Sequence, residues 1–200
     1  MGVTSVLLWK DNNGGHIGMI KFHDRITTTL LGSFKDKWGI QVKLYRDTKN
    51  TETSNSDKFM YTTEFYNTSK IYCLIDDVIV EAEREMESIL EKLKNLWYLT
   101  KTIIYEGSTY IIGDFLIRVA VPKLTSYKGM LVEVEYTSTV NPHVAAPILH
   151  EFIEMLKLPE IEIVPSAEYS FSKIGLSEDT FTRAHTDYQY MMLFKSENLL

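Results

Sequence analysis

Three Glu-x-Glu pairs are the residues of this sequence whose type and spacing could bind a metal ion. Because side chains alternate across a β-strand, both carboxylates of such a pair project from one face. Carboxylate oxygens are good ligands for hard divalent cations, so two or three pairs facing one interior could hold a catalytic metal. The pairs are Glu81 with Glu83, Glu133 with Glu135, and Glu160 with Glu162.

The competing interpretation is that each pair is the solvated face of a strand. Tunnel-type triphosphatases hold their metal with Glu-x-Glu strand pairs, and under that alternative Glu133 and Glu135 would be the ligands. A triphosphate also needs several inward-facing lysines and arginines. The strands supply few of these, chiefly Lys43, Lys101 and Arg118. We therefore expect no metal, no cofactor and no catalytic residue at these pairs.

The remaining reactive side chains match no catalytic motif. Cys73 lies in an apolar run between Tyr72 and Leu74 without a neighbouring base, which favours a buried core position. The histidines never fall at His-x₃-His spacing, and the sequence has no P-loop, Gly-x-Ser-x-Gly or dinucleotide-binding glycine pattern. These observations predict a protein without enzymatic activity. The five histidines are His16, His23, His143, His150 and His185.

A group of large apolar side chains near the C-terminal end is the candidate for a partner interface. Chain ends usually fray unless they are docked, and tyrosine and methionine are enriched at protein interfaces. Two interpretations remain open: docking onto the protein's own core, or burial against another subunit. The candidates are Tyr188, Tyr190, Met191 and Met192.

Composition bounds the class of protein. Of 200 residues, 44% are hydrophobic and 24% are charged, which suits a globular domain with a real core. The net charge of −6 argues against direct nucleic-acid binding, which normally requires a basic excess. A single cysteine excludes an internal disulfide and suits a reducing compartment. No window approaches the length of apolar sequence that a membrane span requires, so we expect none.

The strongest secondary-structure signals lie in 93–136, which we expect to form the core of the sheet. This stretch should hold three or four strands, and the last of them, Met130–Tyr136, alternates apolar and acidic residues. A hairpin is expected from strands at 58–66 and 70–75. Helices are predicted where apolar residues recur every three or four positions. The predicted helices are 16–34, 83–97 and 147–158, the shorter strands are 3–9, 38–46 and 161–164, and 78–82 and 186–194 stay undecided between helix and strand.

These elements predict an α+β fold in a single domain spanning 1–200. Strands joined by tight turns form a largely antiparallel sheet, and a long antiparallel sheet often closes on itself to remove its edges. We therefore expect a barrel-like structure with three or four flanking helices. The apolar-free stretch 47–57 is expected to be a flexible loop. A generic small-ligand β-barrel with an apolar lumen is a further alternative.

Several short segments resemble, in order along the chain, one known family. The most characteristic is Lys128-Gly129 followed by the strand Val132–Tyr136, and Gln189–Met191 resembles the family's C-terminal signature. Together the segments make the chain similar to subunit 20 of the Mediator complex, a head-module family related to the TATA-binding-protein-related factors, with a fungal character. The other matching segments are Met1–Thr4, Lys58–Tyr61, Leu93-Lys94 with Trp97, Asp114–Val119, Glu151-Phe152 and Leu193-Phe194.

The resemblance implies a barrel-like sheet with flanking helices and a role in protein interaction. It implies a heterodimer with Mediator subunit 18, tethering of that pair by the C-terminal helix of subunit 8, and contacts with other head subunits. The implied function is coactivation of transcription by RNA polymerase II, together with the TATA-binding protein, in the nucleus. The resemblance implies no cofactor, no direct nucleic-acid contact and no membrane contact.

Overall fold

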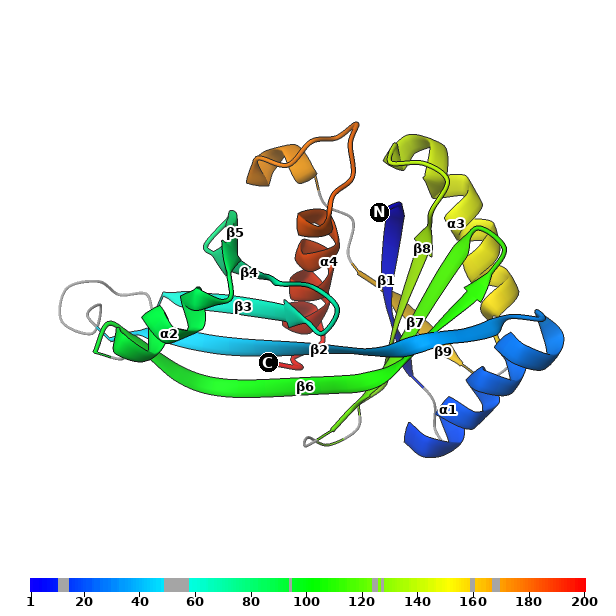
Figure 1. The fold of residues 1–200 in the computed structure, drawn as a ribbon, viewed down its shortest axis with the longest axis horizontal. Helices are drawn as coiled ribbons and strands as arrows, with labels where there is room; N and C mark the ends of the chain where they lie inside the picture. The colour runs from blue at the N-terminus through cyan, green and yellow to red at the C-terminus, as the bar shows by residue number, and fades with distance from the viewer. Residues whose placement is uncertain are drawn as a thin grey trace.

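The computed structural model contains one nine-stranded sheet and four α-helices among the residues it describes (Figure 1). The described residues are 1–10, 15–48, 58–93, 95–123, 126, 128–158, 161–166 and 170–200. The strands are β1 (Val3–Lys10), β2 (Ser33–Asp47), β3 (Phe59–Phe65), β4 (Lys70–Ile75), β5 (Val78–Glu83), β6 (Trp97–Ile112), β7 (Phe115–Pro122), β8 (Met130–Tyr136) and β9 (Glu162–Pro165). The helices are α1 (Gly15–Asp24), α2 (Glu85–Lys92), α3 (Pro142–Leu156) and α4 (Arg183–Ser196), with the π-helix η1 (Arg25–Thr29) and the 3₁₀ turn η3 (Phe171–Ile174).

Two long strands join the two halves of the sheet. All neighbouring strands are antiparallel, in the order β5-β4-β3-β2-β6-β7-β8-β1-β9. One half of β2, Ile40–Arg46, pairs with β3, whereas the opposite end of β6, Tyr105–Ile112, pairs with β7. Figure 1 shows β2 and β6 running across the molecule, with β3, β4 and β5 at one end and β7, β8 and β1 crossing them at the other. We call β3, β4 and β5 the β3–β5 wing. We call β7, β8, β1 and β9, which are neighbours in that order, the β7–β9 wing.

The turn from one wing to the other depends on a glycine in β6. Gly107 pairs with Trp38 on one side and with Ala120 on the other. A Cβ atom at Gly107 would lie 1.8 Å from the carbonyl oxygen of Val119, far inside contact distance. Only glycine therefore allows β6 and β7 to approach this closely.

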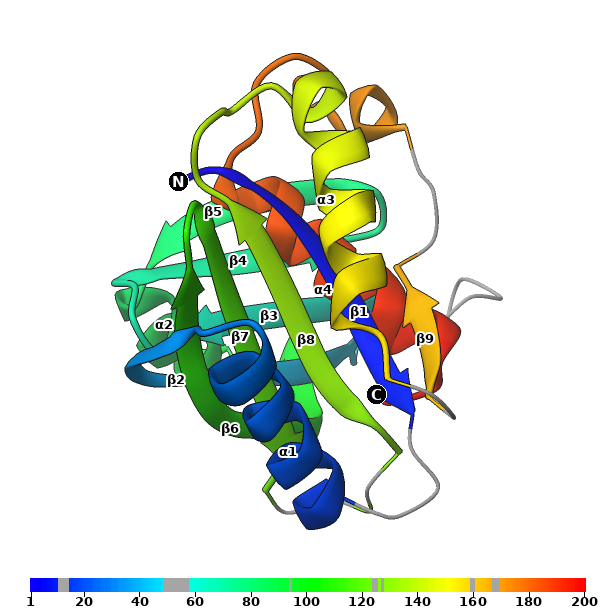
Figure 2. The same cartoon turned by 90° about the vertical axis from the view of Figure 1, so that its right-hand side faces the viewer.

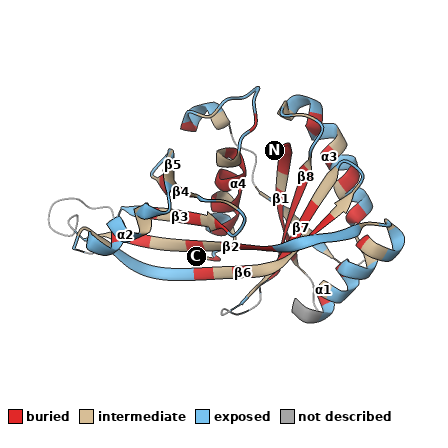
Figure 3. Cartoon of the chain, in the orientation of Figure 1, coloured by how far each residue is buried: buried red, intermediate tan, exposed pale blue. Residues whose placement is uncertain are grey.

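The concave side of the sheet is filled by α4. Figures 1 and 3 show α4 standing between the two wings, buried along nearly all of its length. Its side chains form one continuous apolar core with inward-facing residues of both wings. The central members of this core are Val6, Leu8, Trp38, Ile40, Phe65, Leu74, Tyr105, Leu131, Tyr190, Met191, Leu193 and Phe194.

A second core lies on the opposite face of the β7–β9 wing, beneath α1 and α3 (Figure 2). Because strand side chains alternate, β8 divides its residues between the two cores. Met130, Val132 and Val134 face the helices α1 and α3. The intervening residues Glu133 and Glu135 face α4, so β8 is buried on both sides.

The antiparallel α+β prediction is confirmed, but the prediction of a closed barrel is wrong. The two ends of the sheet are β5 and β9, and no ladder joins them among the described strands. The physical reason is α4, which occupies the concave side and satisfies the inward apolar faces that closure would otherwise bury. Most of the expected flexible loop 47–57 lies outside the described residues.

Several element boundaries also differ from the expectations. The helix predicted over 16–34 ends at Asp24, continues as the π-helix η1, and gives way to β2 at Ser33. The helix predicted from Pro147 begins at Pro142, because Asn141 caps it by accepting hydrogen bonds from two backbone N–H groups. The undecided stretches 78–82 and 186–194 are a strand and a helix. Among the described helices, none is both long and apolar enough to cross a membrane.

Candidate functional site

Glu133 and Glu135 lie inside the protein. They project from β8 towards α4, and their exposed fractions are 0% and 3%. The expectation of a solvated strand face is therefore wrong for this pair. A buried carboxylate needs charged or hydrogen-bonded partners, so its neighbours decide what the pair can do.

Arg118 of β7 is the first partner. It lies opposite Glu133 in the strand register, and its Nη1 is 2.5 Å from Glu133 Oε1 and 2.7 Å from Glu135 Oε2. The other oxygen of Glu135 accepts a hydrogen bond of 2.7 Å from the backbone N–H of Gly2. A Cβ at Gly2 would lie 1.8 Å from the carbonyl oxygen of Tyr136, so only glycine can bring this N–H so close.

The other partners of Glu133 come from α4. Arg183 Nη1 donates to Glu133 Oε1 at 2.8 Å, and its guanidinium stacks 3.8 Å above the ring of Phe65. Tyr190 Oη donates to Glu133 Oε2 at 2.8 Å. Both oxygens of Glu133 are thus occupied by protein donors, and these contacts join α4 to the β7–β9 wing.

The electrostatics of this group favour the ionised form of Glu133. Burial alone would raise the pKa of Glu133, but the guanidinium groups of Arg183 and Arg118 and the hydroxyl of Tyr190 hold that pKa below its usual value. Burial likewise works against the charge of Arg118, yet Glu133 and Glu135 raise its pKa above the ordinary value. Two carboxylates and two guanidinium groups together carry no net charge, as a buried site requires.

This arrangement does not fit a metal centre. A divalent cation would have to replace both guanidinium groups, since they already occupy the carboxylate oxygens. The other pairs do not converge on it: Glu81 and Glu83 are exposed on β5, and Glu162 is exposed on β9. Glu160 lies outside the described residues. Across the described part of the chain, no three histidine, cysteine, aspartate or glutamate side chains come together.

Of the three strand cations named from the sequence, only Arg118 faces the carboxylates. Lys43 forms an ion pair with Glu87 of α2, and Lys101 donates to the backbone carbonyl of Leu199 at 3.1 Å. The second arginine at the site, Arg183, lies in a stretch that gave no clear sequence signal. The Thr182 cap at the start of α4 is the one feature that could have placed Arg183 in the first turn of a helix.

Asp187 is a third buried carboxyl group, and the sequence analysis did not identify it. Its exposed fraction is 0%, and neither carboxyl oxygen has a hydrogen-bond partner among the described residues. The nearby hydroxyl of Thr63 donates to Met191 Sδ at 3.7 Å. Burial, only partly offset by Thr63 and Arg183, raises the pKa of Asp187 to about 7.

The four candidate interface residues lie in α4 and pack within the chain. Tyr190 and Met191 have exposed fractions of 0%, Tyr188 has 8%, and Met192 is half-buried. The ring of Tyr190 lies between Trp38 and Phe65, at centroid distances of 6.2 and 5.7 Å. This placement corresponds to docking onto the protein's own core. The filled interior also excludes a small-ligand barrel with an open lumen.

Cys73, His185 and His23 each have identifiable surroundings in the fold. Cys73 is 3% exposed, and burial raises the pKa of its thiol to about 11, so little reactive thiolate forms at neutral pH. His185 closes a capping box with Thr182 at the start of α4, and burial lowers its pKa. His23 Nδ1 lies 2.8 Å from Tyr110 Oη.

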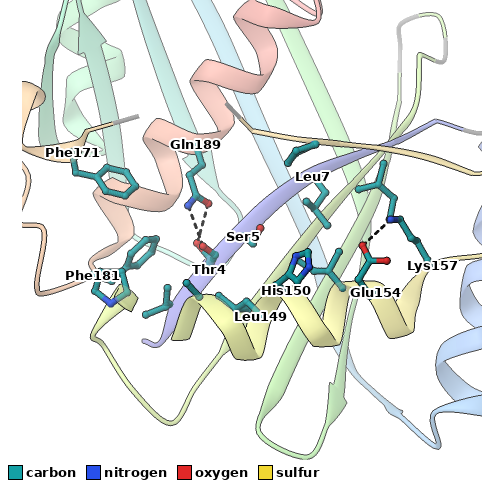
Figure 4. A pocket seen from close by; sticks show the side chains of 16 residues that line it. Thr4, Ser5, Leu7, Leu149, His150, Glu154, Lys157, Phe171, Phe181 and Gln189 are labelled. Carbon is teal, nitrogen blue, oxygen red and sulfur yellow. Dashed lines mark hydrogen bonds and ion pairs between the residues drawn. The ribbon is translucent and has the colours of Figure 1, made fainter. Parts of the chain in front are cut away.

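A surface pocket of about 450 Å³ opens between β1, α3 and the segment before α4 (Figure 4). β9 pairs with Leu7–Lys10 of β1, and the N–H of Ser166, just after β9, donates to the carbonyl of Val6. The pocket lies beside the part of β1 that precedes this pairing. The side chain of Gln189 closes this strand edge by donating to the Thr4 carbonyl at 3.1 Å. The floor is apolar, with Leu149 of α3 among its residues.

The described fold and site define an α+β protein whose open antiparallel sheet encloses its own C-terminal helix through buried ion pairs. A family model described as the TATA-binding related factor of subunit 20 of the Mediator complex matches residues 1–195. The chain belongs to the family of Mediator complex subunit 20.

Two relatives by sequence agree with this assignment. The chain is similar to subunit 20 of the mediator of RNA polymerase II transcription from Schizosaccharomyces pombe, with 32% identity over 130 residues. That match covers 64% of this chain and 64% of the S. pombe protein. Subunit 20b from Arabidopsis thaliana is 28% identical, with 95% of this chain and 93% of that protein covered. A chain in the structure of the S. pombe Mediator head module shares 12% identity at a TM-score of 0.40, covering 78% of this chain and 93% of that one.

Proposed function

We propose that this protein is a non-catalytic subunit of the Mediator head module, acting as a protein-interaction scaffold in RNA polymerase II transcription. The observation that carries the proposal is the family match over residues 1–195. The interior supports it, because the carboxylates that a metal-dependent reaction would need are occupied by Arg118 and Arg183. A nuclear location and a coactivator role follow from the proposal.

The proposed direct partner is Mediator subunit 18, in a heterodimer that the C-terminal helix of subunit 8 tethers to the other head subunits. RNA polymerase II and the TATA-binding protein are the proposed functional partners of the assembly. The side chains Tyr188, Tyr190 and Met191 are buried, so the partner surface should lie elsewhere on the folded chain. Exposed sheet edges are the natural alternative, since unpaired strands offer backbone hydrogen bonds.

The test is co-expression of this chain with subunit 18 from the same organism, followed by size-exclusion chromatography. The expected result is one peak containing both chains in equal amounts at micromolar concentration. Two separate peaks, each containing a folded protein by circular dichroism, would refute the heterodimer. Co-purification of this chain with the remaining head subunits tests the head-module assignment independently of the heterodimer with subunit 18.

A further inference from the structure

The two edges of the sheet differ in how they are protected. The edge strand β9 has four residues and ends in Pro165. The other edge strand, β5, has six residues without proline, and no described segment pairs with its outer side. Proteins usually guard an exposed edge with proline, a bulge or a very short strand, because unpaired backbone groups attract other strands. β5 has none of these three.

One face of β5 presents an apolar row to solvent. Val78 is 60% exposed and Val80 is 50% exposed. They lie on the face away from α4, because the residue between them, Ile79, packs against the core that contains α4. Directly beside Val80 in the register lies Cys73 of β4, which is buried. The apolar surface that is buried at Cys73 of β4 thus continues onto β5, where Val78 and Val80 are exposed to solvent.

The backbone of β5 is also available for pairing. A two-residue turn joins β4 to β5, so Ile75 and Val78 form the pair beside the turn. In such hairpins the pair beside the turn is hydrogen-bonded, and bonded and unbonded pairs alternate along the ladder. The N–H and C=O groups of Ile79, Glu81 and Glu83 therefore point away from β4.

The edge is strongly acidic. The segment 76–87 contains six carboxylates and one arginine, so it holds most of the net negative charge of the whole chain. Glu81 and Glu83 are exposed on the face of β5 opposite to Val78 and Val80. Lys70 is in contact with Glu83 and lies 3.7 Å from Glu81, Lys58 lies 3.7 Å from Asp76, and Lys43 is in contact with Glu87. Together with Arg84, these three lysines are fewer than the six carboxylates, so an excess of negative charge remains at this edge.

We propose that β5 binds an extended basic segment of a partner protein, which adds to the sheet as a further strand. Because side chains alternate, the segment should carry apolar residues on the face of Val78 and Val80 and lysine or arginine on the face of Glu81 and Glu83. The inference rests on the proposed function, since it places the partner segment in another head subunit.

The test measures binding of the full chain to the remaining head subunits of its own organism, assembled without it. Val80→Lys should weaken binding at least tenfold, because it puts a charged side chain against the apolar face of the added strand. Glu81→Lys should also weaken binding at least tenfold, because it puts a positive charge on the face where the added strand carries lysine or arginine. The matched control is Val144→Lys, at a similarly exposed valine on α3, which should change affinity less than twofold.

Hydrogen exchange gives a readout that needs no substitution. The amides of Ile79, Glu81 and Glu83 should exchange at least tenfold more slowly in the assembly than in the free chain. Unchanged affinity with Val80→Lys, together with unchanged exchange, would overturn this inference and leave the proposed function standing. Unchanged affinity with Glu81→Lys would overturn the basic partner. Concentration-dependent protection in the free chain would assign the edge to a second copy and overturn the proposal.

A wild-type chain that fails to bind the head subunits at all would refute the proposed function itself. Its folding would be checked by the protection of β6 and β8 amides in the same exchange experiment. Failure of the proposed function would be seen as absent binding of the wild-type chain. Failure of the β5 inference would be seen as binding of the wild-type chain that Val80→Lys weakens no more than the Val144→Lys control does.

Discussion

Arg118 and Glu133 face each other across β7 and β8, and the guanidinium of Arg118 also reaches Glu135, so one cation holds two carboxylates inside the sheet. Glu133 is held in turn by Arg183 and Tyr190 of α4. This arrangement turns a strand motif that could bind metal into the attachment site of the C-terminal helix.

Removing Arg118 should be severely destabilising. Arg118→Met leaves two buried carboxylates with one guanidinium, and breaking a buried ion pair in this way costs about 3–5 kcal/mol. The measurement is the free energy of unfolding in urea. The matched control is Lys123→Met, which breaks the exposed ion pair with Glu106 and should leave stability unchanged within error. Equal effects of the two substitutions would contradict the role given to Arg118.

Removing the hydroxyl of Tyr190 should lower the free energy of unfolding even though the contacts of the ring remain. Tyr190→Phe keeps the stacking with Trp38 but removes the donor to the buried carboxylate of Glu133, at a cost of about 1–3 kcal/mol. Thermal or urea unfolding measures the difference. Tyr66→Phe makes the same chemical change at an exposed tyrosine bonded to Glu106, and a loss as large as that of Tyr190→Phe would argue against a special role for Tyr190.

Asp187 should make stability depend on pH. Its folded pKa of about 7 lies above the ordinary value of 3.8, so the folded state binds the proton more tightly than the unfolded state. Stability therefore falls as pH rises from about 4 to about 7, and the loss remains above that range. Asp187→Asn removes the ionisable group and should stabilise the protein by about 4 kcal/mol at pH 8, with a smaller gain at pH 5.

Urea unfolding of wild type and Asp187→Asn at several pH values measures this difference. Asp36→Asn, at an exposed carboxyl group on β2, is the control, and its difference from wild type should not vary over the same range. A constant difference between Asp187→Asn and wild type from pH 5 to pH 8 would contradict the raised pKa.

The purified protein should release no phosphate from nucleoside triphosphates in the presence of manganese. The reason is that the oxygens of Glu133 and Glu135 are already bonded to protein donors. A colorimetric phosphate assay at high protein concentration measures the rate. Manganese-dependent release that disappears in Glu133→Gln and Glu135→Gln would show that the pair does bind a catalytic metal.

The sequence was most informative where one periodicity decides the structure. The alternation in Met130–Tyr136 predicted a strand with two distinct faces, and the hairpin at 58–75 was recognisable from its turn. Burial of the acidic face was not predictable from β8 alone. Its partner Arg118 lies on the neighbouring strand, and Arg183 is far away in the sequence.

The C-terminal helix α4 shows why the rest of the interior could not be predicted from the sequence. A helix that packs on one sheet leaves a solvated face, which produces a helical period. α4 contacts both wings, so polar and apolar residues alike are buried around it and no period appears. The same helix explains why the prediction of a closed barrel was wrong. Alternation along a strand indicates that one face is buried, but it does not show whether a helix or another strand covers that face.

The close approach of Gly2 to Tyr136 has a practical consequence for producing this protein. Replacing Gly2 with alanine or serine changes the residue whose amide reaches Glu135. Such a substitution would push the start of β1 away from β8 and expose the ion pairs beneath it. Gly2 is therefore part of the fold, and an affinity tag should be attached so that Gly2 is left unaltered.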